Sequence, residues 1–129
     1  MRGVEIKKVN IVNEDDRRKL VELMNGQFSA KNIKILEVKE DSHLGGKSGH
    51  WHLYPECMYI MKGKCWNYVM ENIDTGEKET YELNEGTIVF RTGRIIHGGM
   101  FAKGSIIIDI GGETYISGEF NDIPREKPK

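Results

Sequence analysis

Short apolar runs alternate with turn-forming residues along most of the chain. Runs of this kind, rich in β-branched and aromatic residues, predict strands. The predicted strands cover residues 4–12, 33–38, 50–52, 57–61, 64–71, 78–83, 87–90, 95–101, 105–110 and 114–116. Residues 17–24 fit either a short helix or a strand. About eight to ten short strands with at most one helix predict an all-β barrel or sandwich.

Period-two alternation along the strand at 64–71 places Trp66, Tyr68 and Met70 on one face.

The length of 129 residues fits a single domain over residues 1–129. Within that domain we expect residues 1–30 to form an N-terminal extension. We expect residues 121–129, which are charged and contain two prolines, to form a frayed tail.

Charge and composition exclude several classes of partner. The 19 Lys and Arg residues nearly balance the 20 Asp and Glu residues, which argues against a nucleic-acid-binding protein. No apolar run approaches the roughly 20 residues of a membrane span, and the N-terminus lacks the apolar core of a secretory signal. Two cysteines, Cys57 and Cys65, are too few for a disulfide framework. We therefore expect reduced thiols in a cytoplasmic protein. The partner that we expect is a small molecule.

The candidate chemistry lies in a histidine pattern. His50 and His52 are two positions apart, Glu56 follows four residues later, and His97 lies in a later predicted strand. The period of two places His50 and His52 on one face, while the bend at Pro55 prevents parity from placing Glu56. A closed barrel is the simple way to bring His97 to the same centre. An isolated His-x-His pair is more often a surface or hydrogen-bonded pair, but the further ligands favour a divalent transition metal: Fe, Mn, Ni or Zn.

These residues resemble the two motifs of the cupin superfamily, commonly written G-x5-H-x-H-x3,4-E-x6-G and G-x5-P-x-G-x2-H-x3-N. Matches are His50, His52, Glu56 and Gly63 in the first motif and Gly86 and His97 in the second. Departures are Gly45, which is one position too close to His50, and Thr92, Arg94 and Phe101, which replace the proline, glycine and asparagine. The resemblance implies a double-stranded β-helix, a small jelly-roll barrel that is often dimeric.

A second likeness lies upstream of the histidines. Residues 16–22, Asp-Arg-Arg-Lys-Leu-Val-Glu, resemble the Asp-x-Arg-Gly-x-Leu opening of cupins that isomerise or epimerise nucleotide-linked keto-sugars, with Arg18 in place of the glycine. The N-terminal strand at 4–12 would leave an open sheet edge, and pairing across a two-fold axis would cover it. We therefore expect a homodimer.

The function that these observations favour is a metal-dependent isomerase or epimerase of a sugar or nucleotide-linked keto-sugar. The metal would act as a Lewis acid and stabilise an enediolate. Glu56, Tyr59 or Tyr68 would move the proton, although tyrosines at such positions also suit a barrel core. Basic residues that could hold a phosphate at the mouth are Lys47, Arg91 and Arg94.

Two alternatives stay open from the sequence. The same ligand set, loaded with iron, would suit a dioxygenase that binds dioxygen beside its substrate. A non-catalytic module that senses a small ligand would also use a barrel interior of this kind. Oxygen uptake by iron-loaded protein would distinguish the dioxygenase from the isomerase.

Overall fold

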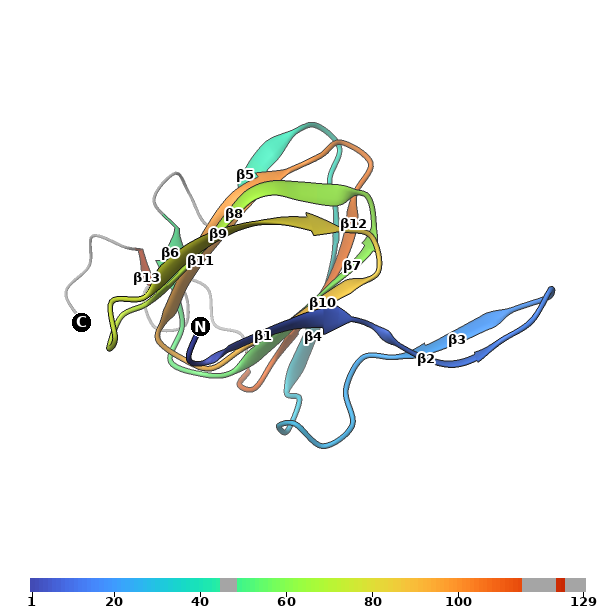
Figure 1. Cartoon of the computed structure of the whole chain (residues 1–129), viewed down its shortest axis with the longest axis horizontal. Coiled ribbons are helices and arrows are strands. Elements are labelled where there is room, and N and C mark those ends of the chain that lie inside the picture. Colours follow the sequence, from blue (N-terminus) through green and yellow to red (C-terminus); the bar gives the residue numbers. More distant parts are fainter. Residues whose placement is uncertain (45–48, 115–122, 125–129) are drawn as a thin grey trace.

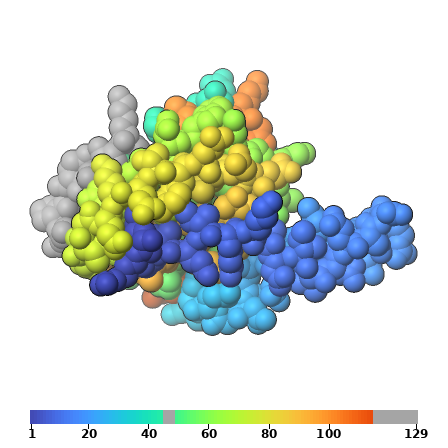
Figure 2. All heavy atoms as spheres, viewed as in Figure 1, coloured from blue at the N-terminus to red at the C-terminus, as the bar shows by residue number. Residues whose placement is uncertain are grey.

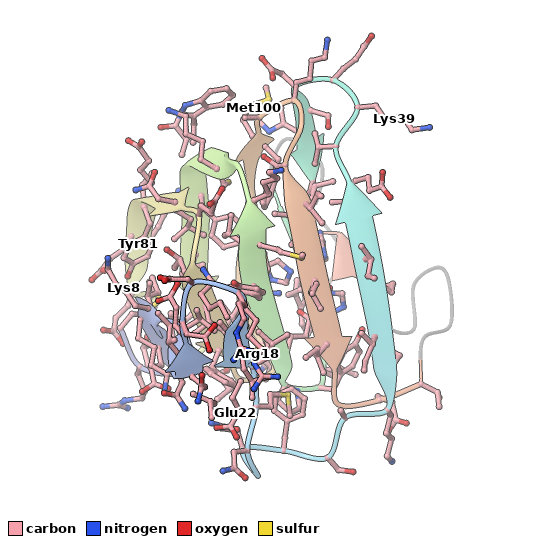
Figure 3. The ribbon with its side chains drawn as sticks, turned by 90° about the vertical axis from the view of Figure 1, so that its right-hand side faces the viewer. Lys8, Arg18, Glu22, Lys39, Tyr81 and Met100 are labelled. Atoms are coloured by element: carbon pink, nitrogen blue, oxygen red, sulfur yellow. The ribbon has the colours of Figure 1, made fainter. Side chains whose placement is uncertain are left out.

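The computed structural model describes residues 1–44, 49–114 and 123–124, and in these residues every regular element is a strand. Two antiparallel sheets face each other and enclose the core (Figure 1). Sheet 1 has five strands in the order β1 (Val4–Lys8), β10 (Thr87–Arg91), β7 (Glu56–Lys62), β12 (Ile106–Gly111) and β4 (Asn32–Glu37). Its strands β7, β12 and β4 lie side by side in Figure 3.

Sheet 2 forms the opposite wall of the barrel. Its order is β13 (Ile123–Pro124), β6 (His50–Trp51), β11 (Ile95–Phe101), β8 (Lys64–Asn72) and β9 (Lys78–Asn84), and β5 (Ser42–Leu44) also pairs with β11. The chain passes repeatedly from one sheet to the other, as between β6 and β7, β9 and β10, and β11 and β12, which is the arrangement of a jelly roll. The prediction of an all-β cupin barrel is confirmed.

A hairpin of β2 (Asn10–Glu14) and β3 (Lys19–Glu22) forms a third, separate sheet. It extends from the barrel as an arm (Figures 1 and 2), and Figure 3 shows Arg18 and Glu22 on it. The single strand predicted at 4–12 is therefore two strands, because the chain leaves sheet 1 at the buried Val9 and pairs with itself beyond that residue. Residues 17–24, which fit a helix or a strand, contain β3.

Apolar side chains pack on both faces of sheet 1. On β7, Met58 and Ile60 face the barrel interior with Phe101 and Ile107, whereas Cys57 and Tyr59 belong to an outer cluster. Apolar residues of the segment that follows β3, namely Leu23, Met24 and Phe28, pack on that outer cluster. The covered outer face explains why β7 is apolar at almost every position.

A β-bulge in β8 changes which residues face inward. The pairing of β8 with β9 shifts between Cys65 and Tyr68, and Asn67 adopts a positive φ of 50°. Cys65 and Tyr68 consequently both point into the core, although they are three positions apart. Trp66 is half-buried outside that core, with the Lys64 ammonium over its ring. The prediction that Trp66 shares a face with Tyr68 is wrong, because a bulge adds one residue to the alternation.

Two terminal predictions fall partly outside the described residues. Of residues 121–129, only Ile123 and Pro124 are described, and they pair with Trp51 and His50. Of the strand predicted at 114–116, only Thr114 is described, and it is not in a strand. Among the described residues, no helix is long and apolar enough to cross a membrane.

Candidate active site

Three histidines meet inside the barrel. His50 lies on β6, His52 directly follows that strand, and His97 lies opposite His50 on β11. The ring centroids of His50 and His97 are 4.4 Å apart, and one ligand atom from each of the three rings lies within 4.8 Å of the others. The approach depends on Gly49, because a Cβ there would lie 2.9 Å from the His97 carbonyl oxygen. The three imidazoles are therefore placed to hold a metal ion.

His97 has a defined tautomer. Its Nδ1 is 2.9 Å from the Ile95 carbonyl oxygen, which can only accept a hydrogen bond, so Nδ1 carries the proton. Burial, and then the positive charge of Arg91, lower the pKa of His97 well below its usual range. His97 is therefore neutral near pH 7, and its Nε2 retains a lone pair that can accept a proton or bind a metal.

A buried ion pair lies beside the histidines. Arg91 on β10 lies directly opposite Glu56 on β7, and Arg91 Nη2 donates to Glu56 Oε1 at 2.9 Å. Arg91 Nη1 donates to the hydroxyl oxygen of Tyr68 at 2.7 Å. The same Glu56 oxygen is 3.3 Å from His52 Nε2 and 3.6 Å from His97 Nε2. One carboxylate oxygen thus lies between a guanidinium and the histidine rings.

Tyr68 is placed to donate a proton. Its hydroxyl oxygen already accepts from Arg91, so its own O–H can be directed at a ligand. Burial raises the pKa of Tyr68, which keeps this proton on the oxygen at neutral pH.

Asp109 on β12 completes the polar wall. Its Oδ1 is 4.0 Å from Arg91 Nη2, and among the described residues neither this oxygen nor Arg91 Nε has a hydrogen-bond partner. Burial and the nearby Glu56 carboxylate raise the pKa of Asp109 to about 6. Asp109 was missed at the sequence level. The available signal was a lone carboxylate within an isoleucine run, on the same face as Ile107.

A cavity of about 250 Å³ lies against several of these groups. Its polar lining comes from Lys34, His50, Tyr68, Arg91, His97 and Asp109, and its apolar lining includes Leu36, Leu44, Met58, Phe101 and Ile107. A few convergent polar groups in an otherwise apolar pocket are typical of small-molecule sites.

The structure brings together most of the predicted site residues. His50, His52 and His97 form the triad, Glu56 lies beside them in its ion pair, and Tyr68 lines the cavity. Tyr59 is not brought to them, because it lies on the outer face of sheet 1.

The three basic residues expected at the mouth differ in position. Arg91 lies inside the barrel, where its side chain is 3% exposed. Arg94 pairs with Asp74 at 2.8 Å, and its guanidinium lies over the Trp51 ring. Lys47 lies outside the described residues. Of the two that are described, Arg91 is the residue in position to act on a group inside the cavity.

Comparisons with known proteins identify the fold. No protein-family profile and no curated protein sequence matches the chain. Among solved structures, the TDP-fucose 3,4-ketoisomerase WlaRA from Campylobacter jejuni superposes with a TM-score of 0.72 at 19% identity, covering 90% of this chain and 85% of that one. The sugar 3,4-ketoisomerase QdtA from Thermoanaerobacterium thermosaccharolyticum, in complex with TDP, gives 0.75 at 17% identity over 98% and 90%. The dTDP-4-dehydrorhamnose 3,5-epimerase from Bacillus anthracis gives 0.73 at 14% over 92% and 76%.

At these identities the likeness establishes the fold alone. The chain has the jelly-roll barrel that these sugar isomerases and epimerases share, over nearly its whole length. The names of these proteins agree with the upstream likeness to nucleotide-sugar cupins at residues 16–22.

Proposed function

We propose that this protein is an isomerase or epimerase of a nucleotide-linked keto-sugar. The observation that carries the proposal is one cavity that combines a neutral imidazole, a tyrosine hydroxyl and a buried guanidinium: His97, Tyr68 and Arg91. These are a base, an acid and a positive charge, which a proton transfer next to a carbonyl requires. The shared fold with sugar ketoisomerases and an epimerase supports the same conclusion.

The residues suggest a defined division of work. His97 Nε2 removes a proton from the carbon next to the keto group, and the C–H electron pair forms the carbon–carbon double bond of an enediolate. The carbonyl electron pair moves to oxygen, which accepts a hydrogen bond from Tyr68 and lies in the field of Arg91. Return of the proton to the other face of the same carbon gives the epimer. Return to the former carbonyl carbon gives the isomer, provided that the hydroxyl proton also passes from one enediolate oxygen to the other. No electron leaves the substrate, so no oxidant is needed.

The size of the cavity suggests which part of the substrate enters it. About 250 Å³ lies at the lower end for small-molecule pockets, which are typically about 300–1,000 Å³. A single sugar ring suits this space, and the nucleotide would extend outside it. Lys34 lines the cavity and is a candidate for the first phosphate.

The site also fits a metal in part. His50, His52 and His97 would hold a divalent Fe, Mn, Ni or Zn ion beside Glu56, whose Oε1 accepts a hydrogen bond from Arg91. Because His97 Nε2 would then be a ligand, this form is an alternative to the one in which His97 is the base. When bound, such an ion would supply Lewis-acid polarisation of the sugar carbonyl. In protein incubated with excess Zn²⁺, His52→Ala is expected to lower the metal content found by elemental analysis while the β-rich circular dichroism spectrum persists. Unchanged metal content in the variant would contradict this ligand set.

The reaction is tested by proton exchange. A panel of TDP-linked 4-keto-sugars is incubated with the protein in D₂O, and carbon-bound deuterium is followed by NMR. We expect deuterium at a carbon that flanks the keto group, and none with His97→Gln. No exchange with any sugar of the panel would contradict the proposal. Oxygen consumption by iron-loaded protein would favour the dioxygenase instead.

We also propose a cytoplasmic homodimer. The arm formed by β2 and β3 exposes Ile11, Val12 and Leu20, each at least 50% exposed, and an isolated two-stranded hairpin is marginally stable in water. Strand β1 lies at one edge of sheet 1, so its outer side is available for pairing. Both cysteines are free and buried, in line with a reducing compartment. A monomeric mass in light scattering would contradict the dimer.

A further inference from the structure

The position of Glu56 creates a conflict between two possible cations. Its Oε1 accepts a hydrogen bond from Arg91 at 2.9 Å and lies within 3.6 Å of Nε2 of both His52 and His97. Among the described residues, this oxygen is the nearest negative ligand atom available to a metal ion held by the histidine triad. The guanidinium already donates a hydrogen bond to it.

The charges around the triad favour the guanidinium. Arg91 has one close carboxylate among the described residues, because the next one, Asp109, is 4.0 Å away. A buried guanidinium needs its counter-charge more strongly than an exposed one does. The three imidazoles bring no negative charge, so a divalent ion would enter a site whose nearest carboxylate, Glu56, is already paired with Arg91.

The same arrangement suits an anion. Arg91 Nη1 also holds the Tyr68 hydroxyl, so a positive charge and an O–H donor lie together on one wall of the cavity. An oxygen that becomes negative during a reaction would be stabilised by both.

We propose that Arg91 competes with a divalent metal ion for Glu56 and thereby makes the histidine cavity a site for an anionic substrate oxygen, such as that of an enediolate, in preference to a metal. This deepens the proposed function and rests on it for the identity of the anion. Arg91 is, on this account, a specificity-determining residue, and its loss converts the cavity into a better metal site.

The test is a double-mutant cycle of metal affinity. Protein stripped with EDTA and returned to chelator-free buffer is titrated with Zn²⁺ and with Mn²⁺ by calorimetry, for the wild type, Arg91→Gln, Glu56→Gln and the double variant. We expect Arg91→Gln to bind at least tenfold more tightly than the wild type, because Glu56 becomes available. Glu56→Gln should stay within about threefold of the wild type, and the double variant should return to that level. Lys103→Gln, an exposed loop change, is the matched control.

Two results would overturn the competition. One is an Arg91→Gln protein that binds metal no more tightly than the wild type. The other is a tenfold loss on Glu56→Gln alone, which would show that Glu56 is already a ligand. If Arg91→Gln folds poorly because Glu56 loses its partner, Arg91→Gln/Asp109→Asn removes the excess negative charge, and its metal affinity is judged by the same criterion.

A second probe examines the anion. Oxalate, a planar dianion that resembles an enediolate, is titrated in EDTA-containing buffer. We expect binding to the wild type and at least a tenfold loss in Arg91→Gln; equal binding by both, or none by the wild type, would overturn the anion preference. Failure of the proposed function is separable, because absent sugar turnover with the expected metal ranking would leave the role of Arg91 intact.

Discussion

The two ends of the barrel interior differ in chemistry although both are buried. At one end, Ile60 is 0% exposed and packs within the apolar core cluster. At the other end, Glu56 and Arg91 are 4% exposed and carry opposite charges. The same strands supply both ends, since the inward positions of β7 run from Glu56 through Met58 to Ile60.

This difference separates the residues that stabilise the fold from those that serve the site. Burying apolar side chains contributes about 25 cal/mol per Å² of surface removed from water. Burying charged groups costs free energy that their mutual attraction repays only in part. A barrel of this size does not need the polar end for folding, so we attribute that end to ligand binding.

Removing the proposed base should produce the largest effect. His97→Gln is expected to lower sugar turnover by about 10²–10⁴-fold, which is the usual contribution of general acid–base catalysis. Thermal melting should change little, because glutamine retains a polar group at the polar end. Unaltered turnover in the deuterium-exchange assay would exclude His97 as the base.

A cavity at the apolar end should affect stability and leave the chemistry intact. Ile60→Ala is expected to lower the unfolding free energy by about 2–5 kcal/mol in urea titrations, because the side chain is fully buried and does not line the cavity. Leu53→Ala, at 60% exposed, is the control and should stay within about 0.5 kcal/mol. Equal destabilisation by the two changes would contradict the division of the interior.

Removal of the tyrosine hydroxyl should have an intermediate effect. Tyr68→Phe keeps the buried ring but leaves Arg91 Nη1 without its acceptor, at a cost of about 1–3 kcal/mol. Turnover should also fall by about tenfold or more, measured as kcat, because the proton donor is lost. A stability loss with unchanged kcat would make Tyr68 a purely structural partner of Arg91.

The pH dependence of stability should reveal the neutral state of His97 through a smaller effect. The pKa of His97 is lowered in the folded state. Below about pH 6.5 the unfolded chain therefore binds a proton at this residue, whereas the native state does not. Stability from this group is therefore present above pH 6.5 and is lost on acidification. The wild type should lose about 1 kcal/mol more than His97→Gln between pH 7 and 5.5 in urea titrations. Parallel pH profiles would mean that His97 titrates normally.

Much of the fold was predictable because strand signals are local. Alternating β-branched runs and glycine turns located most strands of both sheets, and the spacing of His50, His52 and His97 identified the triad. The short strands β5 and β13 were not predicted, because they lie in polar segments expected to be a loop and a frayed tail. The orientation of Trp66 was also wrong, because it depends on a bulge opposite a second strand. A bulge is a property of the pairing between strands, so the alternation of one strand does not show it.

The chain's own residues determined the strand pattern, the histidine triad and the absence of an excess charge, since each depends on residue type and spacing. Tertiary structure alone decided what Glu56 does. From the sequence it is a metal ligand four residues after His52, but in the barrel Arg91 lies directly opposite it on β10 and donates to it. The tertiary structure also placed Tyr68 in the cavity and Tyr59 outside the cavity. These outcomes depend on register between strands distant in sequence, and register determines which charge meets which.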